Sequence, residues 1–599
     1  MIAALGLVLV AGTALATPTT SAANAADAWS ADVPGAAVPT VALSPTVAAN
    51  PTVAANPAVD QPGCRALPAP ARSALRADQA NEAFGVDGTS ATVGIISGSF
   101  GTSGQAAVDA DVAAGLLPGA GNPCGRTQPV RVLIEGSDDD EGRAMAQAVH
   151  SVAPGASIVF ASGGGGDAGV ATAIDALVAA GATVIVDDVQ ADDERPYQRG
   201  AAGAAIQRAV DAGVLYVTAA SNYGVSGAAG YPSAGHPIGG WSTAAYRAGP
   251  CAADVAALYA PESVDCLDVD PGAAVDPELE FTLPAQGAMV ASLNWAEPVG
   301  AVTTQLDYVL RTAGTLNRVS AGDPTIPRVK AGVFSTADTV VTQGVSIVRH
   351  LPAPAAAPPV SIVLTGIPGK PAILHQDPFE STGPDVVGST LFGHQSDPAA
   401  LAVAAVDSDT LTLETFSTLG PATTYFGAGI TEPVSVAGPV VAGADDLPVS
   451  TTVLTGDGIF KGTSAAAPTV AAVAALARQL APDATPADLR AALTEGARMD
   501  GVQTPWDAAI PASRYWGAGL VDAAATLELL APTPSPTPTP TPDPTSSPAP
   551  VSPPSGSALP DRAAAELPAT GAASGGVWGA ALAALSLGAG LVALHRRRA

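Results

Sequence analysis

The stretch that decides the fold is Gly462–Leu480 (GTSAAAPTVAAVAALARQL), in which Gly-Thr-Ser opens a long run of alanine and valine. Alanine is the best helix former, and Ser and Thr favour the cap of a helix, so this run predicts a helix over Ser464–Leu480. A serine in the first turn lies at the positive end of the helix dipole, and its amide can help to stabilise an oxyanion. Gly-Thr-Ser alone is equally typical of an ordinary helix cap.

Short β-branched runs alternate with alanine-rich amphipathic stretches before residue 250. The predicted strands are Val93–Ile96, Val130–Ile134, Ser157–Ala161, Thr183–Asp187 and Val214–Ala219, and the predicted helices are Glu141–Val152, Val170–Ala180 and Gly200–Ala212. Apolar strands separated by helices indicate a parallel sheet that is covered on both faces. The sequence therefore predicts an α/β fold, a doubly wound parallel sheet with helices on both faces.

The alternation stops near residue 250. Residues 251–385 are rich in Pro and Gly, contain β-branched runs such as Val340–Val348 and Val360–Leu364, and predict a β-rich insert, a sandwich. The strand and helix patterns that are typical of the chain before residue 250 return at Ala399–Val406. We therefore expect the α/β domain to be split into a first part, 65–250, and a second part, 386–530, which holds the Gly-Thr-Ser helix.

Both ends of the chain have the composition of targeting and linker segments. Residues 1–25 contain the apolar stretch Ile2–Ala16 and an Ala-x-Ala site at Ala23–Ala25, which predicts a signal peptide. Residues 26–64 are an Ala/Pro-rich linker or pro-segment. Residues 531–566 are rich in Pro, Thr and Ser and predict an extended stalk that reaches roughly 90 Å at about 3.1 Å per residue.

Residues 567–599 begin with Leu567–Gly571 (LPATG), continue in an apolar run to Leu594 and end in a basic tail. The apolar run is long enough for a membrane-spanning helix, and arginines hold a tail on the cytoplasmic side. This order resembles the sorting signal of Gram-positive surface proteins. The resemblance implies that a sortase cleaves between Thr570 and Gly571 and joins Thr570 covalently to peptidoglycan in the cell wall; the alternative is an ordinary membrane anchor.

Charge and cysteine content bear on the possible partners, disulfides and metal sites of the chain. The chain has 25 Lys and Arg against 54 Asp and Glu, a net charge of -29, which argues against a nucleic-acid partner. Four cysteines in an exported chain favour two disulfides, and their order suggests Cys64–Cys124 and Cys251–Cys266. The chain has no Cys-x-x-Cys pair, so zinc is not expected.

The full string Gly462–Pro468 (GTSAAAP) closely resembles the nucleophile motif of the subtilisin/sedolisin clan of serine peptidases. Val217–Asn222 (VTAASN) resembles the strand that delivers the oxyanion-hole asparagine of the clan, and Phe416–Pro421 resembles the loop before the nucleophile. The similarity extends over about 85–250 and 385–527. It implies a serine peptidase acting on peptides or proteins, with Ser464 as nucleophile and Asn222 in the oxyanion hole.

Two positions of the catalytic triad depart from subtilisin. Val93–Phe100 (VGIISGSF) resembles the strand that ends in the triad Asp, but Gly98 stands at the position of that Asp, and no His-Gly-Thr-His occurs. The segment that begins Asp140-Glu141-Gly142 resembles sedolisins, in which a Glu replaces the His. The resemblance implies that Glu141 is the general base, although Met145 occupies the place of its supporting Asp.

Asp188 directly follows a predicted strand that passes the nucleophile in relatives, so we expect its carboxyl group near Ser464. An acidic pair of Glu141 and Asp188 that shares one proton could serve as base, because close like charges raise one pKa. The alternative is that the vicinal Asp pair at this strand end caps a helix or forms an ion pair. His150 falls on the opposite face of its helix from Glu141, and we interpret it and His394 as structural.

No cofactor is expected. Calcium is common in the clan, but the sequence contains no loop of alternating carboxylates, so no metal ligand is assigned. Two functions remain open: an active cell-surface endopeptidase with an acidic base, or an inactive pseudoprotease that serves as a binding or adhesion module of the wall. The intact nucleophile string and Asn222 favour the enzyme, whereas Gly98 and Met145 favour the pseudoprotease. A purely structural stalk is the third alternative.

Overall fold

The computed structural model describes residues 70–531 apart from 138–139, 353–356, 368, 452–455 and 507–508. The predicted signal peptide, nearly all of the two linkers and the sorting signal with Thr570 and Gly571 lie outside the described residues. Within the part of the chain that is described, no helix is both long and apolar enough to cross a membrane.

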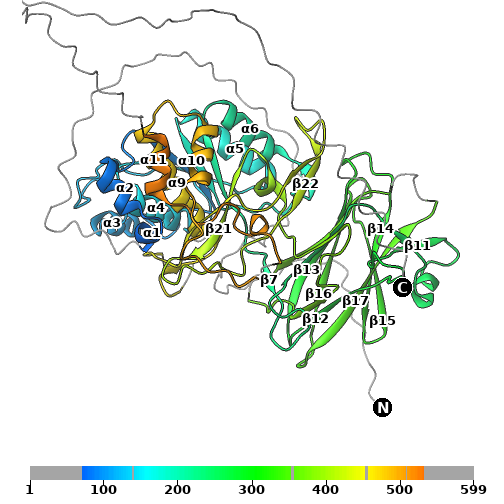
Figure 1. Ribbon diagram of the computed structural model, residues 1–599. Coiled ribbons are helices and arrows are strands. Elements are labelled where there is room, and N and C mark those ends of the chain that lie inside the picture. The colour runs from blue at the N-terminus through cyan, green and yellow to red at the C-terminus, as the bar shows by residue number, and fades with distance from the viewer. Residues whose placement is uncertain are drawn as a thin grey trace, which may run out of the picture. The chain divides into compact units, whose positions relative to one another are not determined.

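A seven-stranded parallel sheet forms the centre of the α/β unit (Figure 1). Its strands run in the order β2 (Arg131–Ile134), β3 (Ser157–Ser162), β1 (Thr92–Ser97), β4 (Val184–Asp187), β6 (Leu215–Ala219), β21 (Leu401–Asp407) and β24 (Val441–Asp445). All neighbouring pairs are parallel. This confirms the predicted sheet, and each predicted strand matches an observed one to within two residues.

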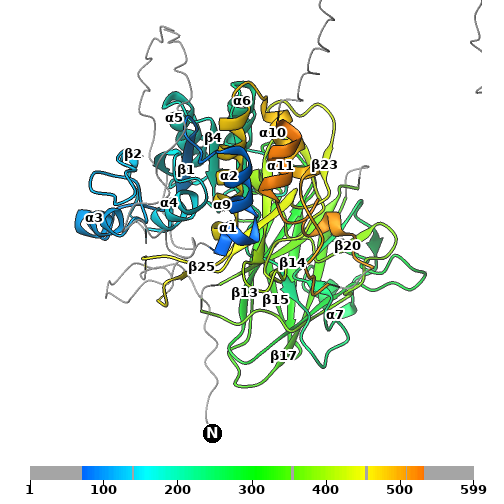
Figure 2. The same ribbon diagram turned by 60° about the vertical axis from the view of Figure 1, so that its left-hand side comes forward.

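Helices cover both faces of the sheet, as predicted (Figure 2). One face packs against α4 (Glu141–Val152) and the long helix α9 (Thr463–Leu480). The opposite face packs against α5 (Gly166–Ala179) and α6 (Ala201–Asp211). The remaining helices are α1 (Pro70–Ala74), α2 (Ala77–Phe84), α3 (Gln105–Ala113), α7 (Ala253–Ala257), α10 (Pro486–Glu495) and α11 (Ala523–Leu530), with short 3-10 turns at Gly393–Ser396 and Ala512–Arg514.

The β-rich insert is a sandwich with its own apolar core, which includes Trp241, Phe281 and Trp295. One sheet contains β10 (Ala248–Gly249), β11 (Val264–Leu267), β17 (Val341–His350), β12 (Leu279–Leu283) and β19 (His375–Asp377), with β14 (Leu306–Thr312) and β15 (Thr315–Ser320) joined to it. The other contains β16 (Arg328–Phe334), β13 (Ala288–Trp295), β18 (Val360–Gly366), β9 (Gly240–Thr243) and β20 (Asp385–Val387). Because β9 belongs to it, the sandwich begins before residue 251.

Small sheets complete the described part. They pair β22 (Ala422–Gly427) with β23 (Val434–Val436) and β5 (Tyr197–Arg199), β25 (Leu447–Pro448) with β26 (Ile459–Phe460), and β7 (Val225–Ser226) with β8 (Pro237–Ile238). The predicted disulfide Cys251–Cys266 is confirmed. Cys124 is disulfide-bonded, and its predicted partner Cys64 lies outside the described residues.

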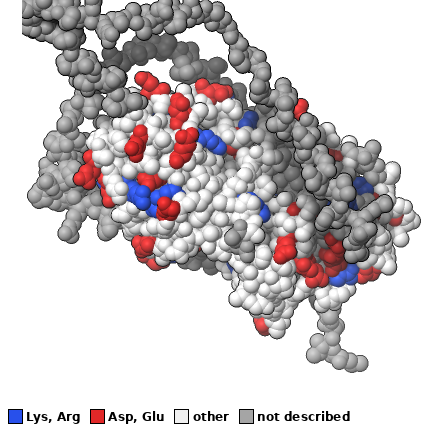
Figure 3. Space-filling model, in the orientation of Figure 1, with Lys and Arg blue, Asp and Glu red and all other residues white. Residues whose placement is uncertain are grey.

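The acidic composition is visible on the surface. On the face drawn in Figure 3, acidic groups are more numerous than basic groups and are spread over both the helical unit and the sandwich. The parallel strands direct their carboxyl ends to one edge of the central sheet, where polar side chains from several strands can meet. Ser97, Asp188 and Asn222 lie at this edge, at or just after the ends of β1, β4 and β6.

Candidate active site

Ser464 is the second residue of α9, and its side chain is nearly buried. Gly462 precedes the helix with a φ of 112°, a left-handed conformation that favours glycine. A Cβ atom at Gly462 would come within 2.8 Å of Asn222 Nδ2, so any residue with a side chain would clash with Asn222 at this turn. The Gly462 amide donates to Asp445 Oδ1 at 2.9 Å. This turn therefore fixes where the Ser464 hydroxyl is presented.

Asn222 lies against the same turn, three residues beyond the end of β6. Its Oδ1 accepts hydrogen bonds from Thr463 N at 2.9 Å and from Thr463 Oγ1 at 3.0 Å. A backbone N–H can only donate, so the amide oxygen must face Thr463 and the NH₂ group must face away from it. The amide of Ser464 belongs to the first turn, whose N–H groups have no acceptor within the helix. Two donors thus lie at the start of α9, as an oxyanion hole requires.

The structure brings Glu141 and Asp188 together. Asp188 lies just after β4 and is partly buried, and its carboxyl group is hydrogen-bonded to that of Glu141, the first residue of α4. Burial raises the pKa of Asp188 well above its usual value, and the negative charges of Glu141 and Asp187 raise it further. Both α4 and β4 contact α9, the helix of Ser464. The pair can hold one proton, and its catalytic role stays a prediction.

Ser97, rather than Gly98, presents a side chain to this carboxyl pair. Ser97 is the last residue of β1 and is fully buried, and its hydroxyl faces Asp188 and lowers the pKa of that residue. Gly98 lies one residue beyond the strand, where its carbonyl accepts a hydrogen bond from Ser162 Oγ at 2.8 Å. The sequence interpretation did not single out Ser97, because a serine at the end of a strand has no local signal for a contact with a distant carboxyl group.

Asp140 and Met145 contribute to the structure around the carboxyl pair: Asp140 holds a loop in place, and Met145 packs in the core. The Asp140 carboxylate accepts from Thr102 N at 2.6 Å and from Ser103 N at 2.9 Å. Burial alone would raise the pKa of Asp140, but these hydrogen bonds outweigh it and lower the pKa. Asp140 thereby ties the loop after β1 to the start of α4. Met145, one turn after Glu141, is fully buried in the core and offers no acid to support it.

His394 lies in a buried ionic network beneath the site. Its Nε2 is 2.9 Å from Asp187 Oδ1 and its Nδ1 is 2.8 Å from Glu194 Oε1, and all three side chains are at most 3% exposed. Burial alone would lower the pKa of His394, but the charges of Glu194 and Asp187 outweigh it and raise the pKa well above its usual value. The imidazolium therefore holds the strand end that precedes Asp188. This network fits the structural role predicted for His394.

The pKa of His150 is shifted in the opposite direction from that of His394. It is buried in α4, and burial together with the nearby charge of Arg126 lowers its pKa to about 4. A neutral, buried imidazole of this kind supports core packing, in keeping with the structural role predicted for it.

A protein-family model matches part of this chain. Residues 286–519 match the model of the subtilase family, Peptidase_S8, and this range includes the whole α9 helix. No curated protein matches the chain.

Several solved protease structures are similar to this chain. The CspB protease of Clostridium perfringens is 13% identical, with 77% of this chain and 97% of that chain covered and a TM-score of 0.45. MycP1 from Mycobacterium smegmatis is 16% identical, with 79% and 86% covered and a TM-score of 0.32. The prenylagaramide maturation protease PagA is 13% identical, with 74% and 94% covered and a TM-score of 0.34. Similarity at this level says nothing about substrate. The match to the subtilase family model covers residues 286–519, and the candidate nucleophile Ser464 lies within this range.

Proposed function

We propose that this chain is a serine-type endopeptidase of the cell surface that hydrolyses peptide bonds through Ser464 with an acidic base. The observation that carries the proposal is the contact between Asn222 Oδ1 and Thr463, which leaves the Asn222 amide as a donor beside the start of α9. A helix cap alone would not need this second donor. A donor aimed at a developing oxyanion contributes about 2.7–4 kcal/mol to catalysis.

In the proposed reaction, Ser464 Oγ attacks the peptide carbonyl and the Glu141–Asp188 pair accepts the serine proton. Asn222 Nδ2 and the Ser464 amide bind the oxyanion. The pair then gives the proton to the leaving amine. A water molecule, deprotonated by the same pair, attacks the acyl-enzyme, the ester bond to Ser464 Oγ breaks, and the pair returns the proton to Ser464 Oγ. A carboxylate is normally a weak base for serine, but the raised pKa of Asp188 brings the basicity of the pair closer to that task.

The alternative is a pseudoprotease that uses the same fold for binding. It is favoured by Gly98 at the expected position of the triad Asp and by Met145 one turn after Glu141, because both positions lack an acid. The large sandwich offers a surface for such a role.

A fluorophosphonate probe distinguishes the two functions. We expect covalent labelling of the wild-type chain within pH 3–8 and none of Ser464→Ala, with cleavage of a mixed peptide library following the same pattern. An absence of both labelling and cleavage across the whole pH range would overturn the peptidase proposal in favour of the pseudoprotease.

Attachment to the wall is a separate part of the proposal, and it is supported by the order of LPATG motif, apolar run and basic tail. A sortase would cleave after Thr570 and join it to peptidoglycan, and the Pro-rich tract would act as a stalk. In cells that express the chain, digestion of the peptidoglycan should release the wild type, whereas Thr570→Ala should stay in the membrane fraction. Equal release of both proteins would refute this attachment.

A further inference from the structure

The α/β unit meets the sandwich beside β22 (Figure 1), and a cavity of about 180 Å³ lies at this junction. Residues of β5 and its neighbour β22 form one wall, and residues of the sandwich strands β9 and β18 form the other. Gln198 Nε2 donates to Glu297 O at 2.8 Å and joins the α/β unit to the sandwich here. None of the residues in the proposed peptidase reaction lines the cavity. It is therefore a site that this reaction does not use.

The volume of the cavity fits one aromatic ring. An apolar cavity of about 150 Å³ binds benzene, so about 180 Å³ leaves room for a ring with one small substituent. None of the described side chains that line the cavity is charged. A charged ligand group would lose its hydration there and gain no counter-ion. Size and lining together favour a small, neutral aromatic ligand.

Aromatic side chains supply much of the apolar wall. The rings of Tyr197 and Tyr425 meet edge to face, with centroids 5.6 Å apart and planes at 77°, and Phe392 also lines the cavity. Aromatic rings favour edge-to-face or offset contacts with a further ring. Tyr197 has a φ of 71°, which is uncommon for a residue with a large side chain and occurs most often at functional sites.

Ser361 supplies a polar group to the same cavity. Its side chain lines the cavity, the residue is only 7% exposed, and its Oγ has no hydrogen-bond partner among the described residues. The Tyr197 hydroxyl interacts with Ser361 electrostatically, but the two do not meet in hydrogen-bonding geometry. Burial raises the pKa of Tyr197, so its hydroxyl stays protonated at neutral pH. A ligand hydroxyl can both donate and accept, and it would give Ser361 the partner that a buried polar group normally has.

We propose that this cavity binds a single neutral aromatic ring that carries a hydroxyl group, the chemistry of a phenol or of a tyrosine side chain. The ring would pack against Tyr197, Tyr425 and Phe392, and its hydroxyl would reach Ser361 Oγ. A free phenol and a tyrosine of a polypeptide share this chemistry, so the experiment includes a probe for each source.

Binding is measured on the purified full chain by saturation-transfer-difference NMR, which detects weak binding of small ligands to large proteins. p-Cresol should bind saturably. Toluene, which lacks the hydroxyl group, should bind about fivefold more weakly, the factor expected for one hydrogen bond. N-Acetyltyrosinamide should bind as well as p-cresol if the ligand is a tyrosine of a polypeptide, whereas binding of p-cresol alone identifies a free phenol. Either result supports the site.

A matched pair of substitutions tests whether the ligand binds in this cavity. Ala244 lines the cavity and is exposed, so Ala244→Phe should block the cavity and weaken p-cresol binding by about tenfold without disturbing the core. Its exposed neighbour Ala245 does not line the cavity, and Ala245→Phe should bind p-cresol like the wild type. Ser361→Ala should weaken the binding of p-cresol and leave that of toluene unchanged.

Circular dichroism and Tm check that each variant folds. The proposal is overturned if the folded wild type shows no saturable binding of p-cresol, or if Ala244→Phe binds p-cresol unchanged. Equal binding of toluene and p-cresol, or an unchanged affinity of Ser361→Ala for p-cresol, would overturn the recognition of the hydroxyl group. None of these readouts uses Ser464, so their outcome is separate from that of the proposed peptidase.

Discussion

The carboxyl group of Asp188 is hydrogen-bonded to the carboxyl group of Glu141, although the two residues come from different elements, β4 and α4. Two carboxyl groups can share a hydrogen bond only when one of them carries a proton. Burial and the charge of Glu141 keep that proton on the pair at pH values where an isolated Asp is ionised. The site therefore combines a proton donor and a proton acceptor in one hydrogen-bonded carboxyl pair.

Asp188→Asn should make the folded state more stable relative to the wild type as the pH rises. The pKa of Asp188 is raised in the folded state, so folding takes up a proton, and wild-type stability falls above the ordinary pKa of an Asp. Each unit of pKa difference contributes about 1.4 kcal/mol. Urea unfolding at several pH values between 4 and 8 checks this, with the exposed Asp483→Asn as control. A stability difference independent of pH would contradict the shared proton.

Asn222→Asp should lower kcat by roughly 10²–10³-fold with little change in Tm. The Asp side chain keeps the oxygen that accepts from Thr463 but loses the NH₂ donor of the oxyanion hole. Thr463→Val is the matched control, because it removes one hydrogen bond to Asn222 and leaves the donor in place. Steady-state kinetics with a peptide substrate measure kcat for both variants. An Asn222→Asp variant with the kcat of the wild type would exclude Asn222 from the oxyanion hole.

His394→Gln should destabilise the protein by about 3–5 kcal/mol at neutral pH, because the substitution leaves the buried carboxylates of Asp187 and Glu194 without a counter-ion. The pKa of His394 is raised in the folded state, so its contribution is complete below the unfolded pKa of about 6.5 and disappears as the pH rises through the folded value. The stability difference from the wild type should therefore shrink at alkaline pH. Urea unfolding measures it.

A second substitution tests the cause of that loss. His394→Gln combined with Glu194→Gln should recover part of the stability, because it removes one of the uncompensated charges. A double variant as unstable as the sum of the two single variants would show that the ionic network is not the source of the effect.

Removal of the Cys251–Cys266 disulfide by substitution of both cysteines with Ser should cost about 3 kcal/mol, the chain-entropy value for a loop of about 15 residues. The bridge lies in the sandwich, so labelling of Ser464 by a fluorophosphonate should be unchanged. Urea unfolding and probe labelling on the same preparation test both statements. A loss of labelling without global unfolding would reveal coupling between the sandwich and the active site.

The sequence alone determined the elements and the local motifs. The helix predicted over Glu141–Val152 has these bounds in the structure, because apolar periodicity is a local property of the chain. The GTSAAAP string located Ser464 at a helix N-terminus, and VTAASN located Asn222, because each needs only a few consecutive residues. The sandwich was also predicted, except for β9 and β10, which lie before the change in composition.

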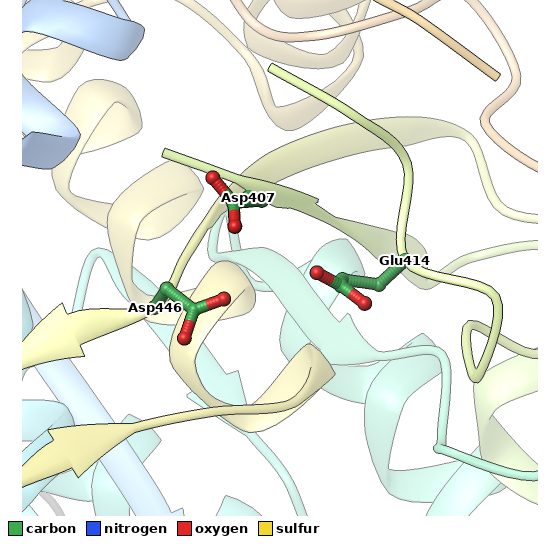
Figure 4. A group of neighbouring side chains, drawn as sticks. All are labelled: Asp407, Glu414 and Asp446. Atoms are coloured by element: carbon green, nitrogen blue, oxygen red, sulfur yellow. The ribbon is translucent and has the colours of Figure 1, made fainter. Parts of the chain in front are cut away.

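Tertiary structure alone decided which side chains face one another. Ser97 ends β1, and the pairing of β1 with β4 brings its buried side chain close to Asp188, a contact between segments that are 91 residues apart in the sequence. Asp407, Glu414 and Asp446 come together because β21 pairs with β24 (Figure 4), and no local pattern of the sequence predicts that contact. The sequence therefore located the candidate nucleophile Ser464, whereas the folding of distant segments brought the carboxyl groups of Glu141 and Asp188 together, because contacts between segments depend on strand register.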